Sequence, residues 1–192
     1  MNYKEILGAL AIVIAFIGYV PYFRDILRNK TKPHAFSWFV WGLLTAIAFF
    51  GQVADKGGPG AWVTGFTAVI CIIISLFGLV KGRKNIVLID WVSLVGCGVA
   101  LILWFLTKGP LLSVVLITII DALAFFSTFR KSFSKPHEET ASTYTLSSLK
   151  FVLSVLALNK ITVVTALYPM SLVLMNGIFV VMLFVRRKQL KV

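Results

Sequence analysis

Two charged side chains lie near the middle of apolar stretches of this chain. Asp121 lies near the middle of Gly109–Phe129, and Lys150 lies near the middle of Thr140–Asn159. A charge at the centre of a hydrocarbon layer costs about 2.5–3.5 kcal/mol even on the scales that give the smallest values. The two residues are therefore expected to face each other or a wet cavity. Two interpretations stay open: a buried salt bridge between neighbouring helices, or a charged part of a solute site in which the carboxylate could also carry a proton.

Polar side chains recur at helical spacing in the other apolar stretches. In the third stretch they are Thr64, Thr67, Cys71 and Ser75, which share one face of a helix. Similar faces occur in the second, fourth, fifth, sixth and seventh stretches. A single serine or threonine in a membrane helix most often bonds its own backbone or a neighbouring helix. One polar face in six stretches predicts a cavity that several helices line.

Six residues on these faces are candidate ligands for a solute. Asn176 offers a donor and an acceptor on one uncharged amide, which suits a hydroxylated molecule. The six candidates are Trp41, Thr67, Cys71, Asp121, Lys150 and Asn176.

The composition excludes several classes of protein. The chain has 192 residues, of which 59% are hydrophobic and only 14% charged, whereas soluble proteins carry about 25% charged residues. A soluble enzyme, a disordered tail and a secreted disulfide scaffold are therefore excluded. The net charge of +12 would favour nucleic acid in a soluble chain, but here most of the cations lie between apolar runs. We expect a multi-pass protein of the cell membrane whose partner is the lipid bilayer, with no nucleic acid.

No pattern for catalysis or metal binding is present in the sequence. The two cysteines, Cys71 and Cys97, lie in apolar runs without metal-ligand or disulfide spacing. No nucleophile–base pair and no glycine-rich phosphate loop occurs. We expect neither an enzyme nor a metal site, and no cofactor.

Seven stretches have the length of a membrane-spanning helix, which is about 20 residues. Four carry no charge and three carry one each. The seven stretches are Ile6–Phe23, Ala35–Ala54, Gly57–Val80, Asn85–Thr107, Gly109–Phe129, Thr140–Asn159 and Ile161–Val185.

The lysines and arginines alternate along the connections between these stretches. Of the 19 cations, fourteen fall in the first, third and fifth connections and the C-terminal segment, four fall on the opposite side, and Lys150 lies within a stretch. The positive-inside rule then places the N-terminus outside and the C-terminus in the cytoplasm. An odd number of spans is needed for this alternation, so the charges support seven spans independently of hydropathy.

The chain also resembles itself. Tyr22–His34 matches Phe125–His137 at an offset of 103 residues, and both segments end in Lys-Pro-His. Thr64–Lys81 aligns with Pro169–Arg186 at an offset of 105 residues. We expect an all-α membrane protein of seven transmembrane helices, arranged as two parallel three-helix bundles joined by a linker helix (3+1+3). The expected bounds are 1–82, 83–107 and 108–192. Parallel repeats of this kind are a transporter architecture with the site between the halves.

This layout resembles the SWEET/PQ-loop transporter superfamily, as a divergent bacterial-type member. The residues that carry the resemblance are Gly18–Pro21, the basic loop Lys30–Lys32, Ser37, Asn176 and Arg186–Lys188. The chain differs from the family pattern in having Tyr22 where the signature has glutamine, and Ala124 where a second proline is expected.

The resemblance implies further residue roles. It places Pro21 at the end of the first span and makes Pro21 and Pro169 candidate hinges. It assigns the counterpart of Asn176 to a sugar pocket and adds Phe50, near the position of a pocket tryptophan, to the candidate ligands.

The expected function is transport of a small polar solute, a sugar or similar molecule, by alternating access between the two bundles. Transport could be facilitative or proton-coupled, so protons are a second candidate partner, and the protein could act as a monomer or a homo-oligomer. The alternative is a non-transporting membrane receptor or sorting protein of the same fold. A retinal protein is disfavoured because the seventh stretch has no lysine.

Overall fold

The protein is helical throughout the part that the computed structural model describes, which comprises residues 2–29, 33–81, 88–134, 136–139 and 141–190. Within these ranges there are seven α-helices and two short 3-10 helices, and no strand. The prediction of an all-α protein is confirmed. The elements are α1 (Tyr3–Leu27), α2 (Ala35–Ala54), η1 (Gly58–Ala61), α3 (Trp62–Lys81), α4 (Leu88–Thr107), α5 (Leu111–Ser134), η2 (Pro136–Glu138), α6 (Ala141–Leu156) and α7 (Val163–Gln189).

Five of these helical segments are long and apolar enough to cross a membrane, judged by length and composition. They are Tyr3–Leu27, Ala35–Ala54, Gly58–Lys81, Leu111–Ser134 and Val163–Gln189. The other two predicted spans correspond to α4, in which Trp91–Thr107 is the apolar stretch found, and to α6, which has 16 residues. The expected boundary between residues 82 and 83 lies outside the described residues.

Polar caps mark where the long helices begin. The Asn2 side chain accepts a hydrogen bond from the backbone of Glu5, whose carboxylate in turn accepts from the backbone of Asn2. Thr162 and Thr165 form the same reciprocal arrangement at the start of α7. Such capping boxes satisfy backbone N–H groups that the first turn of a helix leaves without partners.

Both candidate hinge prolines lie inside helices. Pro21 is in α1 and Pro169 is in α7. The expectation that Pro21 ends the first helix is therefore wrong, since α1 continues to Leu27. A proline inside a helix removes one backbone hydrogen bond, and the turns on either side of it can still hold the helix together.

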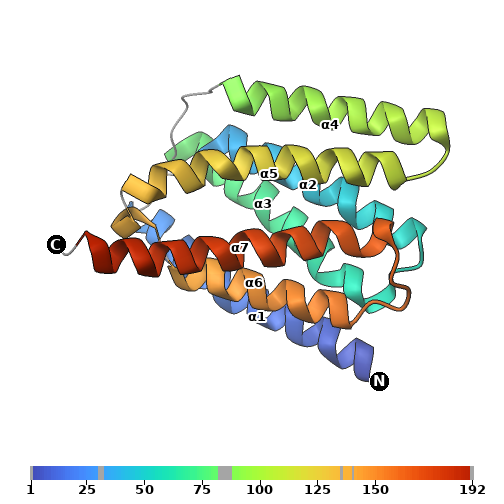
Figure 1. The fold of residues 1–192 in the computed structure, drawn as a ribbon, viewed down its shortest axis with the longest axis horizontal. Coiled ribbons are helices and arrows are strands. Elements are labelled where there is room, and N and C mark those ends of the chain that lie inside the picture. Colours follow the sequence, from blue (N-terminus) through green and yellow to red (C-terminus); the bar gives the residue numbers. More distant parts are fainter. Residues whose placement is uncertain (1, 30–32, 82–87, 135, 140, 191–192) are drawn as a thin grey trace.

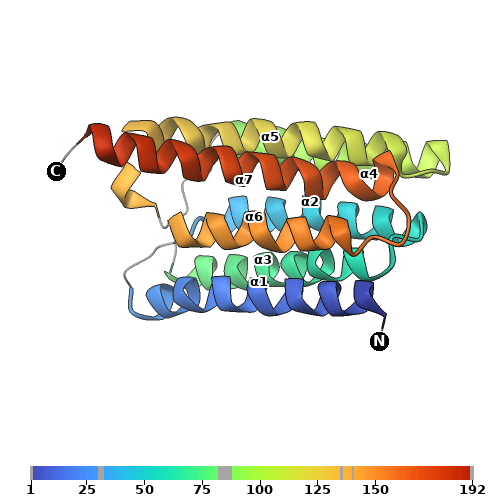
Figure 2. The same ribbon diagram turned by 60° about the horizontal axis from the view of Figure 1, so that its bottom comes forward.

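We refer to the three helices before α4 (α1, α2 and α3) and the three after it (α5, α6 and α7) as the two sets of helices, by their order in the chain. Helix α3 contacts α1 and α2, and α7 contacts α5 and α6. The two sets meet where α6 packs against α1 and α3 and where α2 packs against α5 and α7, while α4 packs against α5 and α2. Exchanging α1, α2 and α3 for α5, α6 and α7 leaves the contacting pairs among these six helices unchanged, whereas the contacts of α4 do not follow this exchange. Figures 1 and 2 show the helices running side by side, with the two termini at opposite ends.

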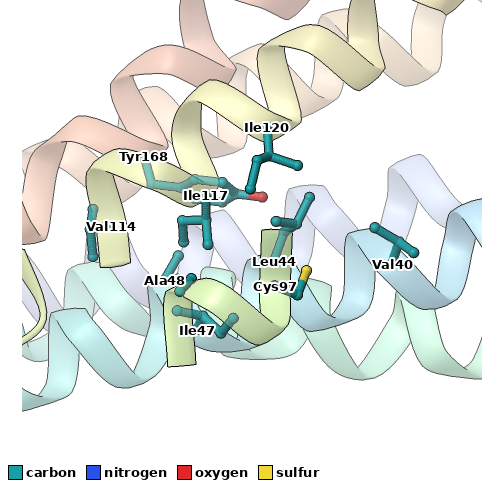
Figure 3. Close-up of a cluster of buried hydrophobic side chains, with 10 residues drawn as sticks. Val40, Leu44, Ile47, Ala48, Cys97, Val114, Ile117, Ile120 and Tyr168 are labelled. Atoms are coloured by element: carbon teal, nitrogen blue, oxygen red, sulfur yellow. The ribbon is translucent and has the colours of Figure 1, made fainter. Parts of the chain in front are cut away.

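Two apolar clusters hold the sets together. One joins α2, α4, α5 and α7 around Leu44, Cys97 and Ile117, with the Tyr168 ring lying across them (Figure 3). The other joins α1, α3 and α6 and includes Ala15 and Phe151. The small residues Gly8, Ala11, Ala15 and Gly18 of α1 are buried, which allows close approach of the neighbouring helices.

Candidate functional site

A cavity of about 710 Å³ lies between the two sets of helices. This volume is within the range of sites that bind small molecules, about 300–1,000 Å³. Its wall contains hydroxyl, amide and charged groups as well as aromatic rings. The lining residues are Tyr19, Tyr22, Pro33, His34, Ser37, Trp38, Trp41, Thr45, Thr67, Cys71, Asp121, Phe125, Thr128, Glu139, Thr143, Tyr144, Ser147, Lys150, Phe151, Tyr168, Leu172 and Asn176.

The cavity reaches only one end of the molecule. Pro33 and His34 belong to the connection after α1, and Glu139 belongs to the connection after α5. Both connections are among those rich in lysine and arginine. None of the lining residues comes from the connections at the opposite end. We call these two ends the hollow end and the sealed end.

Six of the seven candidate ligands from the sequence line this cavity. They come from five helices: Trp41 from α2, Thr67 and Cys71 from α3, Asp121 from α5, Lys150 from α6 and Asn176 from α7. The structure does not place Phe50 with them. The Phe50 side chain is 59% exposed on the outside of α2, beside Phe49.

Lys150 is buried and bridges three helices. Its Nζ donates to the Thr67 hydroxyl of α3 at 2.9 Å and to the Tyr19 hydroxyl of α1 at 3.2 Å. The Thr67 hydroxyl donates its own proton to the Val63 carbonyl, which leaves its lone pairs to accept from Lys150. The ammonium also lies 4.7 Å from the centre of the Tyr19 ring and 4.9 Å from that of Phe151. Aromatic faces attract cations, so these contacts offset part of the burial cost.

Asp121 does not pair with Lys150. Its side chain is 4% exposed and lines the cavity, and among the described residues it forms no hydrogen bond or ion pair. The salt bridge considered from the sequence is therefore not formed. The physical reason is the order of the helices: α7 lies between α5 and α6, so the two successive helices face different neighbours.

Asn176 presents an acceptor to the cavity. Its Nδ2 donates to the Leu172 carbonyl at 2.7 Å. A carbonyl oxygen can only accept, so this bond identifies the amide nitrogen and leaves Oδ1 as the atom free to receive a proton donor. No hydrogen bond to this Oδ1 is formed by the described residues. The deep part of the cavity therefore contains two unused acceptor groups, the Asp121 carboxylate and the Asn176 carbonyl.

Tyrosines are the lining residues that the sequence analysis missed. Tyr19 holds Lys150, and Tyr144 donates to Glu139. The Tyr168 hydroxyl of α7 lies 3.2 Å from the Thr45 hydroxyl of α2. Because the Thr45 hydroxyl donates its own proton to the Trp41 carbonyl, the Tyr168 hydroxyl is the donor in this bond between the two helices. A tyrosine within an apolar run is a usable signal, because a buried phenol needs a hydrogen-bond partner.

The sealed end is closed by hydrogen bonds between the two sets of helices. The Ser154 hydroxyl of α6 donates to the Gly60 carbonyl of η1 at 2.6 Å. The Gln52 amide of α2 donates to the Thr165 carbonyl of α7 at 2.9 Å. Lys4 at the start of α1 donates to the Leu158 carbonyl after α6 at 2.7 Å. Helix η1 contacts α1, α2, α3 and α6, so it fills the centre of this end.

An ion pair stands at the surface of the sealed end. Lys160 Nζ lies 2.6 Å from Asp55 Oδ1, and the Thr162 hydroxyl donates to the other carboxylate oxygen. These two hydrogen bonds, first that of Lys160 and then that of Thr162, hold the pKa of Asp55 below its ordinary value. Both partners of Asp55 belong to the connection before α7, so the pair joins the two sets of helices.

No family model, curated protein or solved structure matches this chain.

Proposed function

We propose that this protein is a multi-pass membrane transporter of a small polar solute that works by alternating access between two three-helix bundles. In this proposal α1–α3 and α5–α7 are the bundles, α4 is the linker, and all seven helices span the bilayer. The cation-rich hollow end faces the cytoplasm, as the positive-inside rule predicts. The resemblance to the SWEET/PQ-loop superfamily remains part of this proposal.

One observation carries the proposal: a polar cavity between the two sets of helices reaches one end of the molecule, while hydrogen bonds close the other end. A carrier that exposes its site to one side at a time needs this asymmetry in each of its end states. In a transporter built of two repeats, rocking of one half against the other around the site can close the open end and open the closed one. The paired helix contacts support such a relation between the halves.

The wall of the cavity supports a polar solute rather than a lipid. Hydroxyl and amide groups from at least five helices face the cavity, among them Ser37, Thr128, Thr143 and Ser147. These groups can replace the water that a solute loses on entry. The buried charges Asp121 and Lys150 are typical of solute and ion pathways inside membrane proteins.

Uptake into liposomes tests this function. Purified protein reconstituted in liposomes should take up a labelled solute from a panel of sugars, amino acids and vitamins, and excess unlabelled solute inside should accelerate uptake by exchange. Protein-free liposomes and liposomes with heat-denatured protein are the controls. Absence of uptake across the panel would contradict transport and favour the non-transporting receptor.

A further inference from the structure

We propose that the transported solute is a zwitterion, a molecule with both an ammonium and a carboxylate such as an amino acid, and that Asp121 binds its ammonium group. This inference rests on the proposed transport function and names the class of solute. It follows from two buried charges of opposite sign that face one cavity without pairing with each other.

The Asp121 carboxylate is the group that needs an external partner. It is almost fully buried, it faces the cavity, and among the described residues it has no hydrogen bond or ion pair. A buried carboxylate without a partner is strongly unfavourable, so a cation entering the cavity gains most by binding there. The free carbonyl oxygen of Asn176 is a second acceptor in the same cavity. An ammonium has three donors and suits such a pair of acceptors.

Lys150 supplies the opposite charge. The Tyr19 and Thr67 hydroxyls accept two of its three donors, but neither hydroxyl carries a negative charge. The third donor and the positive charge are therefore available to an anionic group in the cavity. A solute carboxylate would complete the coordination of Lys150, just as a solute ammonium would complete that of Asp121.

A neutral sugar fits this wall less well. Its hydroxyls can hydrogen-bond to Asp121 and Lys150 but leave both charges uncompensated in a buried site. A simple cation or a simple anion compensates only one of the two. The aromatic rings of the wall, which include Trp38, Trp41 and Tyr168, add attraction for an ammonium and for an apolar side chain.

Competition for uptake tests the inference. Proteoliposomes are first assayed with labelled phenylalanine, glutamine, lysine, glutamate and glucose. For the amino acid taken up fastest, its decarboxylated amine and its deaminated acid are then used as competitors. We expect the amino acid to compete at least tenfold better than either analogue, and glucose to compete least.

Substitution of Asp121 sharpens the test. Asp121→Asn should lower uptake of the amino acid at least tenfold and should abolish the advantage of the amino acid over its deaminated acid. Asp121→Glu keeps the charge and should retain part of that advantage. Asp25→Asn removes a carboxylate at the hollow end, where Asp25 pairs with Arg24. This control variant should change neither the uptake of the amino acid nor its advantage over its deaminated acid as a competitor. Because Lys150 also bridges three helices, the Asp121 variants decide the outcome.

The two proposals fail in different ways. Uptake of glucose without uptake of any amino acid, or equal competition by the amino acid and its two analogues, would overturn the zwitterion inference and leave transport standing. Unchanged competition in Asp121→Asn would overturn the role of Asp121. No uptake of any of the five solutes would overturn the zwitterion inference, and no uptake across the wider panel of sugars, amino acids and vitamins would overturn both proposals.

Discussion

The two ends of this helical bundle are packed differently: one is closed by small residues and hydrogen bonds, and the other contains the cavity. At the sealed end a short 3-10 helix with Gly58 and Gly60 fills the space between four helices, and hydroxyl and amide groups bond directly to backbone carbonyls. At the hollow end the corresponding space is lined by large aromatic and polar side chains and is left empty. Small residues permit close packing at the sealed end, whereas bulky aromatic and polar side chains line the cavity at the hollow end.

The comparison teaches which bonds must change if the bundle alternates. Contacts at the sealed end join α2 with α7, η1 with the end of α6, and α1 with the connection after α6. Each of them crosses between the two sets of helices. Opening this end therefore requires their loss, whereas the bridge from Lys150 to Tyr19 and Thr67 lies midway and can persist.

Two serines on the same face of α6 provide the most direct test of the difference between the hollow end and the sealed end. Ser147 lines the cavity, and Ser154, seven residues later, is fully buried in the sealed end. In a background with Cys71 and Cys97 replaced by alanine, Ser147→Cys should react with a water-soluble methanethiosulfonate reagent faster than Ser154→Cys by about tenfold or more. Unfolded protein should label equally at both positions. Equal rates in the folded protein would contradict the difference between the ends.

Gly60 tests how tightly the sealed end is packed. A Cβ atom at this position would lie 2.6 Å from the Ser154 carbonyl oxygen and 2.6 Å from a methyl carbon of Leu158. Gly60→Leu should therefore destabilise the protein by about 1–3 kcal/mol through overpacking, measured as thermal unfolding in detergent. Gly98→Leu is the matched control, because a Cβ there meets no heavy atom within 4 Å. Equal melting temperatures for the two variants would show that the sealed end is loosely packed.

Substitution of Asp55 is expected to have the smallest effect on stability, and this effect depends on pH. The native pKa of Asp55 is lowered, so the native state favours the charged carboxylate. The resulting stabilisation is present above the unfolded pKa of about 4 and is lost as the pH falls through the lower native pKa. Asp55→Asn should reduce stability near pH 6 by less than about 1 kcal/mol, since the pair is at the surface.

The partner residue provides the control for Asp55. Lys160→Gln should produce a similar loss, and the double variant should lose little more than either single variant. Melting temperatures measured from pH 6 to pH 3 should converge between the wild-type protein and Asp55→Asn. A difference that does not narrow between pH 6 and pH 3 would contradict the assignment of this pH dependence to Asp55.

Hydropathy and periodicity predicted much of this structure. The stretch Ala35–Ala54 coincides with α2, whereas α1 (Tyr3–Leu27) extends beyond the uncharged stretch Ile6–Phe23 at both ends, because a helix can continue past an apolar run into polar residues. Polar spacing identified Thr67 and Cys71 on α3 and Asp121 on α5, all of which line the cavity. Helical spacing determines which residues share a face, and burial of polar groups requires that face to point inward.

Partners in space could not be predicted in the same way. The contacts of Lys150 with Tyr19 and Thr67 depend on α6 packing against α1 and α3, and nothing local in the sequence determines which helices meet. The absence of Phe50 from the cavity wall has a simpler reason. Phe50 lies nine residues after Trp41, and at 100° per residue this is about 180° away on the helix. Since Trp41 faces the cavity, Phe50 faces outward.

Two atoms in the sealed end carry a consequence for the energetics of the proposed cycle. Gln52 Oε1 and Thr64 Oγ1 are buried without hydrogen-bond partners among the described residues. Each such orphan penalises the shut arrangement by about 1–3 kcal/mol. Hydration of the sealed end on opening would relieve that penalty while the hydrogen bonds between the two sets of helices are lost, so the two contributions oppose each other. The smaller the net difference between these contributions, the smaller the difference in solute affinity that is needed to shift the population between the two states.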